Sequence, residues 1–193
     1  MRAVLVLTLA TLTTLVLAQP HAAPQQPFQA LPEIAPAPEF VLTSQDGSQV
    51  ALADFRGKVV AVTFIFTMCT LTCPVLTPMM SFVQDRLGPD FGERIAFVSI
   101  TVDPERDTPE VLKSYVESFD TPIVALTGTA EEVKEAAKAY RVYYAKHPRS
   151  DGEYDMDHSA VVYVMDPSGR FTATFTPDST AQAIAERLQK LLS

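Results

Sequence analysis

Cysteine, histidine and tryptophan are scarce in this chain. Its 193 residues contain two cysteines, three histidines and no tryptophan. Two cysteines allow at most one disulfide within the chain. Neither of them directly follows the apolar stretch at the N-terminus, which excludes the attachment point of a bacterial lipoprotein there.

Basic residues are outnumbered by acidic ones. The chain has 15 Lys and Arg against 23 Asp and Glu, and its formal net charge is −8. A charge of that sign argues against binding to nucleic acid or to an anionic membrane surface. It is compatible with a basic partner or with cations, although solubility alone explains it.

Long apolar runs are confined to the N-terminus. Arg2 supplies a positive charge, residues 3–17 are uncharged and apolar, and Val16-Leu17-Ala18 offers a small-residue cleavage site. This pattern predicts a secretory signal peptide over residues 1–18. The run is shorter than the roughly 20 residues of a membrane span, although retention as an N-terminal anchor stays open. We therefore expect an exported protein, in the bacterial periplasm or at the extracytoplasmic face of the membrane.

The chain beyond the leader divides into a linker and one domain. Residues 19–37 are rich in Pro, Ala and Gln, which is typical of an extended linker. Residues 38–193 have the length and apolar content of one domain. Outside the cytosol thiols tend to oxidise, so a cysteine pair in this domain is a disulfide, a metal site or a redox couple that a partner keeps reduced.

Strand and helix patterns alternate along the domain. A hairpin is expected at its start, with a turn at Asp46-Gly47. The other expected strands cover residues 58–66, 95–102, 123–126, 142–146, 158–165 and 170–175, and the expected helices cover 74–87, 108–119, 129–140 and 179–192. Alternation of this kind predicts an α/β sheet whose first strands are parallel. The order of elements is that of the thioredoxin fold, with a central mixed sheet flanked by helices and an N-terminal hairpin.

Cys69 and Cys73 lie between a buried strand and a helix, directly before Pro74. Residues four apart on a helical turn have Cβ atoms roughly 5–6 Å apart, which suits a disulfide or a shared metal ion. The helix N-terminus favours thiolate over thiol, and thiolate is both the nucleophile and the metal ligand. Two small buried side chains, or a purely structural disulfide, remain alternatives.

Three segments together resemble the Sco/SenC family of thioredoxin-like copper proteins. They are Thr67–Pro74 (TMCTLTCP), Val102–Pro109 (VDPERDTP) and Met156–Ser159 (MDHS). The resemblance covers residues 38–192. It implies a copper protein that acts in assembly of the binuclear copper centre of cytochrome c oxidase, with Cys69, Cys73 and His158 as metal ligands. Thr70-Leu71 stand where family members usually have Pro-Asp, which bears on recognition of a partner or copper donor.

The ligand set suits copper on chemical grounds. Thiolates favour Cu(I), and imidazole serves both oxidation states, although zinc could use the same three groups with a water. Asp103 and Asp157 are candidates to support the ligands, Asp157 by accepting a hydrogen bond from the free ring nitrogen of His158. Both are equally explained as loop or turn residues. His147 is expected at the surface.

Two functions from different classes follow. The first is a copper metallochaperone that delivers its cargo to the copper-bearing subunit of cytochrome c oxidase. The second is a thiol–disulfide oxidoreductase that reduces cysteines of that subunit, with Cys69 as nucleophile and Cys73 as resolving thiol. The Cys-x3-Cys spacing favours the metallochaperone, because thioredoxin-like reductases usually have Cys-x-x-Cys. Such reductases also have a cis-proline just before the strand beside the motif, and residues 157–164 contain no proline. A peroxiredoxin-like peroxidase is a weaker third possibility, in which Arg106 would approach Cys69. A copper donor or a thiol reductant is a possible further partner.

Overall fold

The structure is a computed structural model that describes the backbone of residues 36–68, 73–119 and 122–192, with side chains from 36–68, 79–119 and 122–192. The predicted signal peptide (1–18) and almost all of the predicted linker (19–37) lie outside the described residues. Within the described part, no helix has the length and apolar character that a membrane span requires.

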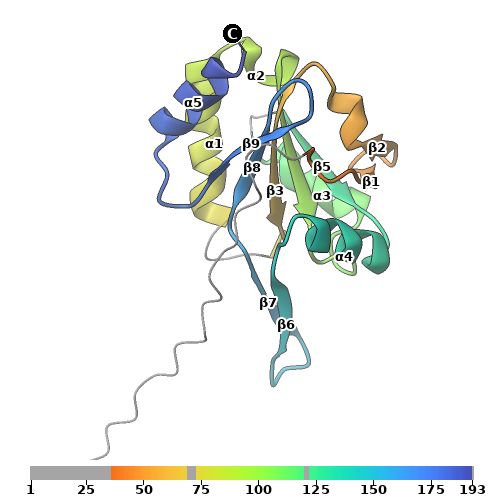
Figure 1. Ribbon diagram of the computed structural model, residues 1–193. Coiled ribbons are helices and arrows are strands. Elements are labelled where there is room, and N and C mark those ends of the chain that lie inside the picture. The colour runs from red at the N-terminus through yellow and green to blue at the C-terminus, as the bar shows by residue number, and fades with distance from the viewer. Residues whose placement is uncertain (1–35, 69–72, 120–121, 193) are drawn as a thin grey trace, which may run out of the picture.

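A seven-stranded mixed sheet forms the centre of the molecule (Figure 1). The strand order is β2-β1-β5-β4-β3-β8-β9, where β3, β4 and β5 are parallel and the other neighbours are antiparallel. The strands are β1 (Val41–Ser44), β2 (Gln49–Ala51), β3 (Val59–Ile65), β4 (Ile95–Thr101), β5 (Ile123–Thr127), β8 (Val162–Met165) and β9 (Phe171–Phe175). The predicted mixed sheet with an N-terminal hairpin is confirmed. The second hairpin strand ends earlier than expected, because Leu52–Phe55 form the short 3-10 helix η1.

Helices cover both faces of the sheet (Figure 1). One face packs against α1 (Cys73–Leu87), α2 (Asp90–Glu93), α3 (Pro109–Glu117) and α5 (Ala181–Lys190), and α4 (Ala130–Ala139) covers the other. Every residue of β4 is buried, and so is every residue of β3 except Thr63. Both strands are mostly apolar, because a strand covered on both faces has no side that faces solvent.

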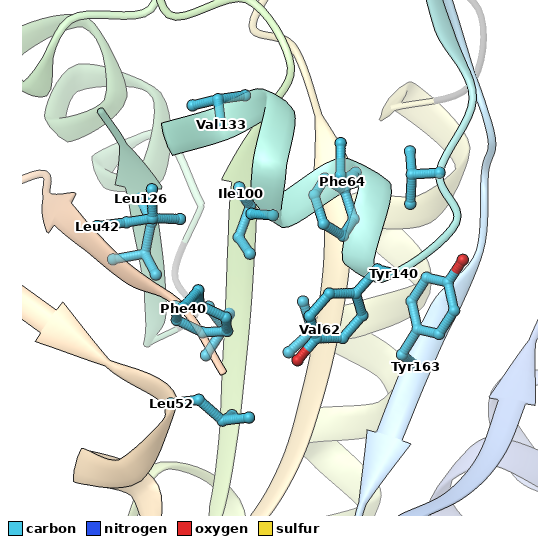
Figure 2. Packing of buried hydrophobic residues seen from close by; sticks show 14 of the residues in the cluster. Phe40, Leu42, Leu52, Val62, Phe64, Ile100, Leu126, Val133, Tyr140 and Tyr163 are labelled. Carbon is cyan, nitrogen blue, oxygen red and sulfur yellow. The ribbon is translucent and has the colours of Figure 1, made fainter. Parts of the chain in front are cut away.

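The core beneath α4 is built around Tyr140 (Figure 2). Its ring lies 5.7 Å from the ring of Phe64 and 5.4 Å from that of Tyr163, measured between centroids. The Tyr140 hydroxyl donates to the carbonyl oxygen of Pro38 at 3.0 Å. This bond satisfies the one polar atom of a side chain that is otherwise surrounded by hydrocarbon.

Three helices begin at capping threonines, at or next to the predicted helix starts. The side chains of Thr108, Thr129 and Thr180 accept from the backbone N–H groups of Val111, Glu132 and Ala183. Each bond satisfies one of the N–H groups that the first turn of a helix leaves without a partner. Thr129 and Glu132 form a capping box.

The predicted strand over residues 158–165 is confirmed over Val162–Met165 (β8), but its first part is not. The chain forms a separate hairpin of β6 (Tyr144–Pro148) and β7 (Tyr154–His158), and β8 begins only at Val162. In β7 the buried Met156 alternates with exposed aspartates, which is the period of a strand with one face in the core. The hairpin projects from the end of the sheet where the carboxyl end of β3 lies (Figure 1). His158 is therefore the last residue of β7 and not the first residue of β8.

Candidate metal centre

The two cysteines belong to the connection between β3 and α1. β3 ends at Ile65, and α1 begins at Cys73, so the motif lies at the carboxyl end of a parallel strand. Open α/β sheets place their ligand sites at this end. Cys69 lies outside the described residues, as does the side chain of Cys73. The predicted helix over residues 74–87 is confirmed.

His158 lies against the segment that leads into Cys69. The imidazole ring meets the ring of Phe66 edge-on, with centroids 5.5 Å apart and an interplanar angle of 88°. Phe66 precedes Cys69 by three residues and is buried. The fold thus brings together two parts of the chain that are more than 80 residues apart in sequence.

The hydrogen bonds of His158 select one tautomer. Nδ1 is 3.2 Å from the carbonyl oxygen of Ser159. A carbonyl can only accept, so Nδ1 carries the proton and Nε2 keeps its lone pair. Nε2 is buried and finds no hydrogen-bond partner among the residues that the structure describes. A buried lone pair of this kind fits a metal ion.

Burial also sets the charge of His158. Desolvation lowers the pKa of the imidazole below its usual 6.5, and it outweighs the opposing effects of the Ser159 carbonyl and the Asp157 carboxylate. The neutral ring is the form that binds metals, so the free protein holds His158 ready for a ligand role at neutral pH.

In the structure the carboxylate of Asp157 pairs with His147 and not with the ring of His158. One carboxylate oxygen of Asp157 lies 2.8 Å from Nε2 of His147, and both side chains are largely exposed. Successive residues of a strand point to opposite faces, so Asp157 turns outward where His158 turns inward. The backbone carbonyl of Ser159 takes the place expected for the carboxylate. His147 lies at the surface, as predicted.

Asp103 and Asp107 are buried in the connection between β4 and α3. Asp103 accepts from the hydroxyl of Tyr154 at 2.7 Å and from Nε of Arg106. Burial, together with the bond to Asp103, raises the pKa of Tyr154, so this hydroxyl stays a donor. Asp107 accepts from the backbone N–H and the hydroxyl of Thr67, two residues before Cys69. Neither carboxylate forms a hydrogen bond with the imidazole.

Tyr154 is a residue that the sequence patterns did not single out. Its carbonyl oxygen accepts from Nη1 of Arg106 at 3.0 Å, and its ring lies 3.8 Å from the guanidinium carbon. These contacts hold Arg106 beside Asp103 and Tyr154. Because Cys69 lies outside the described residues, the expected approach of Arg106 to it stays a prediction. Among the described side chains, which include neither cysteine, no three His, Asp or Glu residues form a metal-binding group.

Comparison with known proteins identifies the family. The SCO1/SenC family model matches residues 29–193. The chain belongs to this family. Protein sco1 of Schizosaccharomyces pombe is 37% identical over 153 residues, which cover 77% of this chain and 58% of that protein. The mitochondrial SCO1 homolog of Homo sapiens is 36% identical over 152 residues, which cover 76% of this chain and 49% of that protein. The chain thus spans about half to three fifths of the length of these relatives.

Solved structures of SCO1/SenC proteins share the fold. The Bradyrhizobium japonicum ScoI structure with copper bound has a TM-score of 0.76 and 37% identity, covering 82% of this chain and all of that one. Yeast Sco1 with copper bound has a TM-score of 0.73 and 31% identity, covering 81% of this chain and 87% of that one. BsSco, described as a cytochrome c oxidase assembly protein with a disulfide switch, has a TM-score of 0.63 and 25% identity, covering 84% and 96%. These likenesses confirm the predicted thioredoxin-like fold.

Proposed function

We propose that this protein is an exported metallochaperone that binds copper through Cys69, Cys73 and His158. The copper is cargo, delivered to the binuclear copper centre of cytochrome c oxidase through the copper-bearing subunit. Related Sco proteins have been solved with copper bound, and BsSco belongs to a family of cytochrome c oxidase assembly proteins. The predicted leader supports a location outside the cytosol.

The observation that carries the proposal is the environment of His158. Its ring packs against Phe66, three residues before Cys69, and its buried Nε2 has no hydrogen-bond partner among the described residues. Leaving a buried polar atom without a partner costs about 1–3 kcal/mol. A metal ion bound at Nε2 would remove that cost. Two thiolates and one neutral imidazole form a donor set that copper accepts in both oxidation states.

Delivery requires that a partner can approach the cargo. Met68, the residue directly before Cys69, is 65% exposed. Tyr143 is 57% exposed and is joined to Ser159 by two hydrogen bonds, beside His158. Both segments that carry the proposed ligands therefore have a solvent-exposed side chain next to a ligand. A site open on one side can exchange ligands with an acceptor protein.

Copper stoichiometry of purified variants tests the ligand set. We expect the reduced wild-type protein to bind one copper per chain. Cys69→Ser and Cys73→Ser should each abolish tight Cu(I) binding, and His158→Ala should weaken Cu(II) binding most. His147→Ala is the matched control, because it removes an exposed imidazole from the same hairpin. If His158→Ala bound both oxidation states as tightly as wild type, the imidazole would not be a ligand.

A transfer experiment tests delivery. The copper-loaded protein is mixed with the metal-free copper-bearing domain of the oxidase subunit, and the two are separated and assayed for copper. The proposal predicts that copper moves to the acceptor faster than it is released to solution. Transfer no faster than free release would contradict a chaperone role.

The thiol–disulfide oxidoreductase remains the second candidate. The disulfide switch described for BsSco favours it, since that protein is 25% identical to this chain. In this role the dithiol of Cys69 and Cys73 would give two electrons and two protons to a disulfide of the oxidase subunit and become a disulfide itself. Reduction rates no better than those of a free dithiol would leave only the copper role.

A further inference from the structure

The connection between β4 and α3 contacts both segments that lead to the proposed ligands. On the cysteine side, Asp107 accepts from the backbone N–H of Thr67 at 3.1 Å and from its hydroxyl at 2.5 Å. Thr67 precedes Cys69 by two residues. A buried carboxylate therefore holds the segment directly before the cysteine motif.

On the histidine side, the same connection holds Tyr154. Asp103 accepts from the Tyr154 hydroxyl, and Arg106 donates to the Tyr154 carbonyl while lying over its ring. Lys146 covers the ring as well, at 4.5 Å from the centroid. Tyr154 begins β7, and His158 ends it. A strand of this length is stiff, so fixing its first residue restricts where its last residue lies.

The two carboxylates are joined to one another. The hydroxyl of Thr101 donates to Asp107 at 2.6 Å and accepts from the backbone N–H of Asp103 at 2.9 Å. The backbone N–H of Asp107 donates to the carbonyl of Asp103 at 2.9 Å. Thr101, Asp103 and Asp107 are each at most 1% exposed. The three residues thus form one buried hydrogen-bonded unit.

We propose that Thr101, Asp103, Arg106 and Asp107, here called the clasp, position the cysteine segment and the histidine strand relative to each other for copper. This inference rests on the proposed function. The clasp residues are positioning residues, because they act through Thr67 and Tyr154 and are not themselves ligands.

The charges of the clasp favour a fixed geometry. The Asp103 carboxylate is paired with the Arg106 guanidinium, and the Asp107 carboxylate receives three hydrogen bonds. A buried carboxylate that lost these partners would be strongly destabilised, so the partners are held in place. A site whose ligands are held before the metal arrives loses less conformational freedom on binding, which raises affinity.

Two mild substitutions release one segment each. Tyr154→Phe removes the hydroxyl that reaches Asp103 but keeps the ring under Arg106. Thr67→Val removes the hydroxyl that reaches Asp107 but keeps the backbone N–H bond. We expect Tyr154→Phe to weaken Cu(II) about tenfold and Cu(I) much less, because two thiolates suffice for Cu(I) while Cu(II) depends more on the imidazole. Thr67→Val should weaken both ions, about tenfold each.

Competition titrations with Cu(I) and Cu(II) chelators, on the full chain, measure these affinities. The Cu(II) absorption and electron paramagnetic resonance spectra should keep the wild-type form, because the ligands are unchanged. Tyr140→Phe and Thr172→Val are the matched controls: each deletes a hydroxyl that donates to a backbone carbonyl elsewhere in the fold. We expect both controls to bind either ion with wild-type affinity.

Two results would overturn the clasp. One is wild-type affinity for both ions in Tyr154→Phe and Thr67→Val. The other is an equal loss of copper affinity in the two controls, which would show that the effect comes from a general loss of stability. Failure of the proposed function looks different, because wild type would then bind no copper or would keep it after Cys69→Ser or His158→Ala.

Discussion

The imidazole of His158 and the ring of Phe66 meet edge-on, with centroids 5.5 Å apart. Phe66 follows β3 directly and His158 ends β7, so this contact joins the central sheet to the projecting hairpin. Because Phe66 also belongs to the core beneath α4, the position of His158 is coupled to the stability of that core.

Replacing Phe66 with alanine should therefore affect both the core and the histidine. Phe→Ala changes in cores cost about 3–5 kcal/mol, and we expect Phe66→Ala to lower the free energy of unfolding by an amount in that range. The ring-proton resonances of His158 should shift as well, since they lose a neighbouring aromatic ring. Denaturant unfolding and NMR measure the two effects. A cost below about 1 kcal/mol, with unmoved resonances, would show that the two rings do not pack in solution.

The titration of His158 gives a second prediction. Burial lowers the folded-state pKa below the usual 6.5, so below pH 6.5 the unfolded chain binds more protons than the folded one. The free energy of unfolding should then fall as the pH drops from 6.5 to the folded-state pKa, and level off below it. NMR titration of the metal-free protein gives the folded value, with His158→Gln to assign the resonance. A midpoint above 6.5, or the same pH dependence of stability in His158→Gln, would refute this prediction.

Asp157 offers a third prediction, from its outward position. Its pairing with His147 is solvent-exposed, and such pairs contribute about 0–1 kcal/mol. Asp157→Asn should therefore leave the free energy of unfolding and the copper affinity close to wild type. Chelator competition and denaturant unfolding measure both. A tenfold loss of copper affinity would instead support Asp157 as a residue that orients His158.

Oxidation of the cysteine pair gives a fourth prediction. A disulfide between Cys69 and Cys73 would remove both thiolates from the proposed donor set, which would leave one imidazole. We expect the oxidised protein to bind less than a tenth as much copper as the reduced protein at equal metal concentration. Copper analysis after treatment with an oxidant and then with a reductant measures this. Equal binding in both states would argue against thiolate ligation.

The sequence predicted the features that depend on local signals. The helix starts at Thr108, Thr129 and Thr180 were correctly placed, because a capping hydroxyl bonds to a backbone N–H only three residues away. The buried β3 and β4 were likewise evident from their apolar runs. The order of these elements was enough to indicate the thioredoxin-like fold.

Features that depend on contacts between distant segments were missed. β7 contains two aspartates, which disfavour a strand when judged alone. It forms because it pairs with β6 and buries Met156. Without β7 the sequence could not indicate that Asp157 and His158 point to opposite faces of a strand. Tyr154 gave no signal at all, since its partners Asp103 and Arg106 are about 50 residues away in sequence.

The hairpin of β6 and β7 is held to the rest of the molecule at Tyr154, so a change at its tip should leave its base in place. Residues 149–153 are exposed and lie on the far side of Tyr154 from His158. Exposed loop tips tolerate inserted sequence, and here an insertion would lengthen a segment whose base stays fastened. An epitope or a fluorophore grafted between Arg149 and Glu153 would therefore report on the whole molecule without displacing the imidazole.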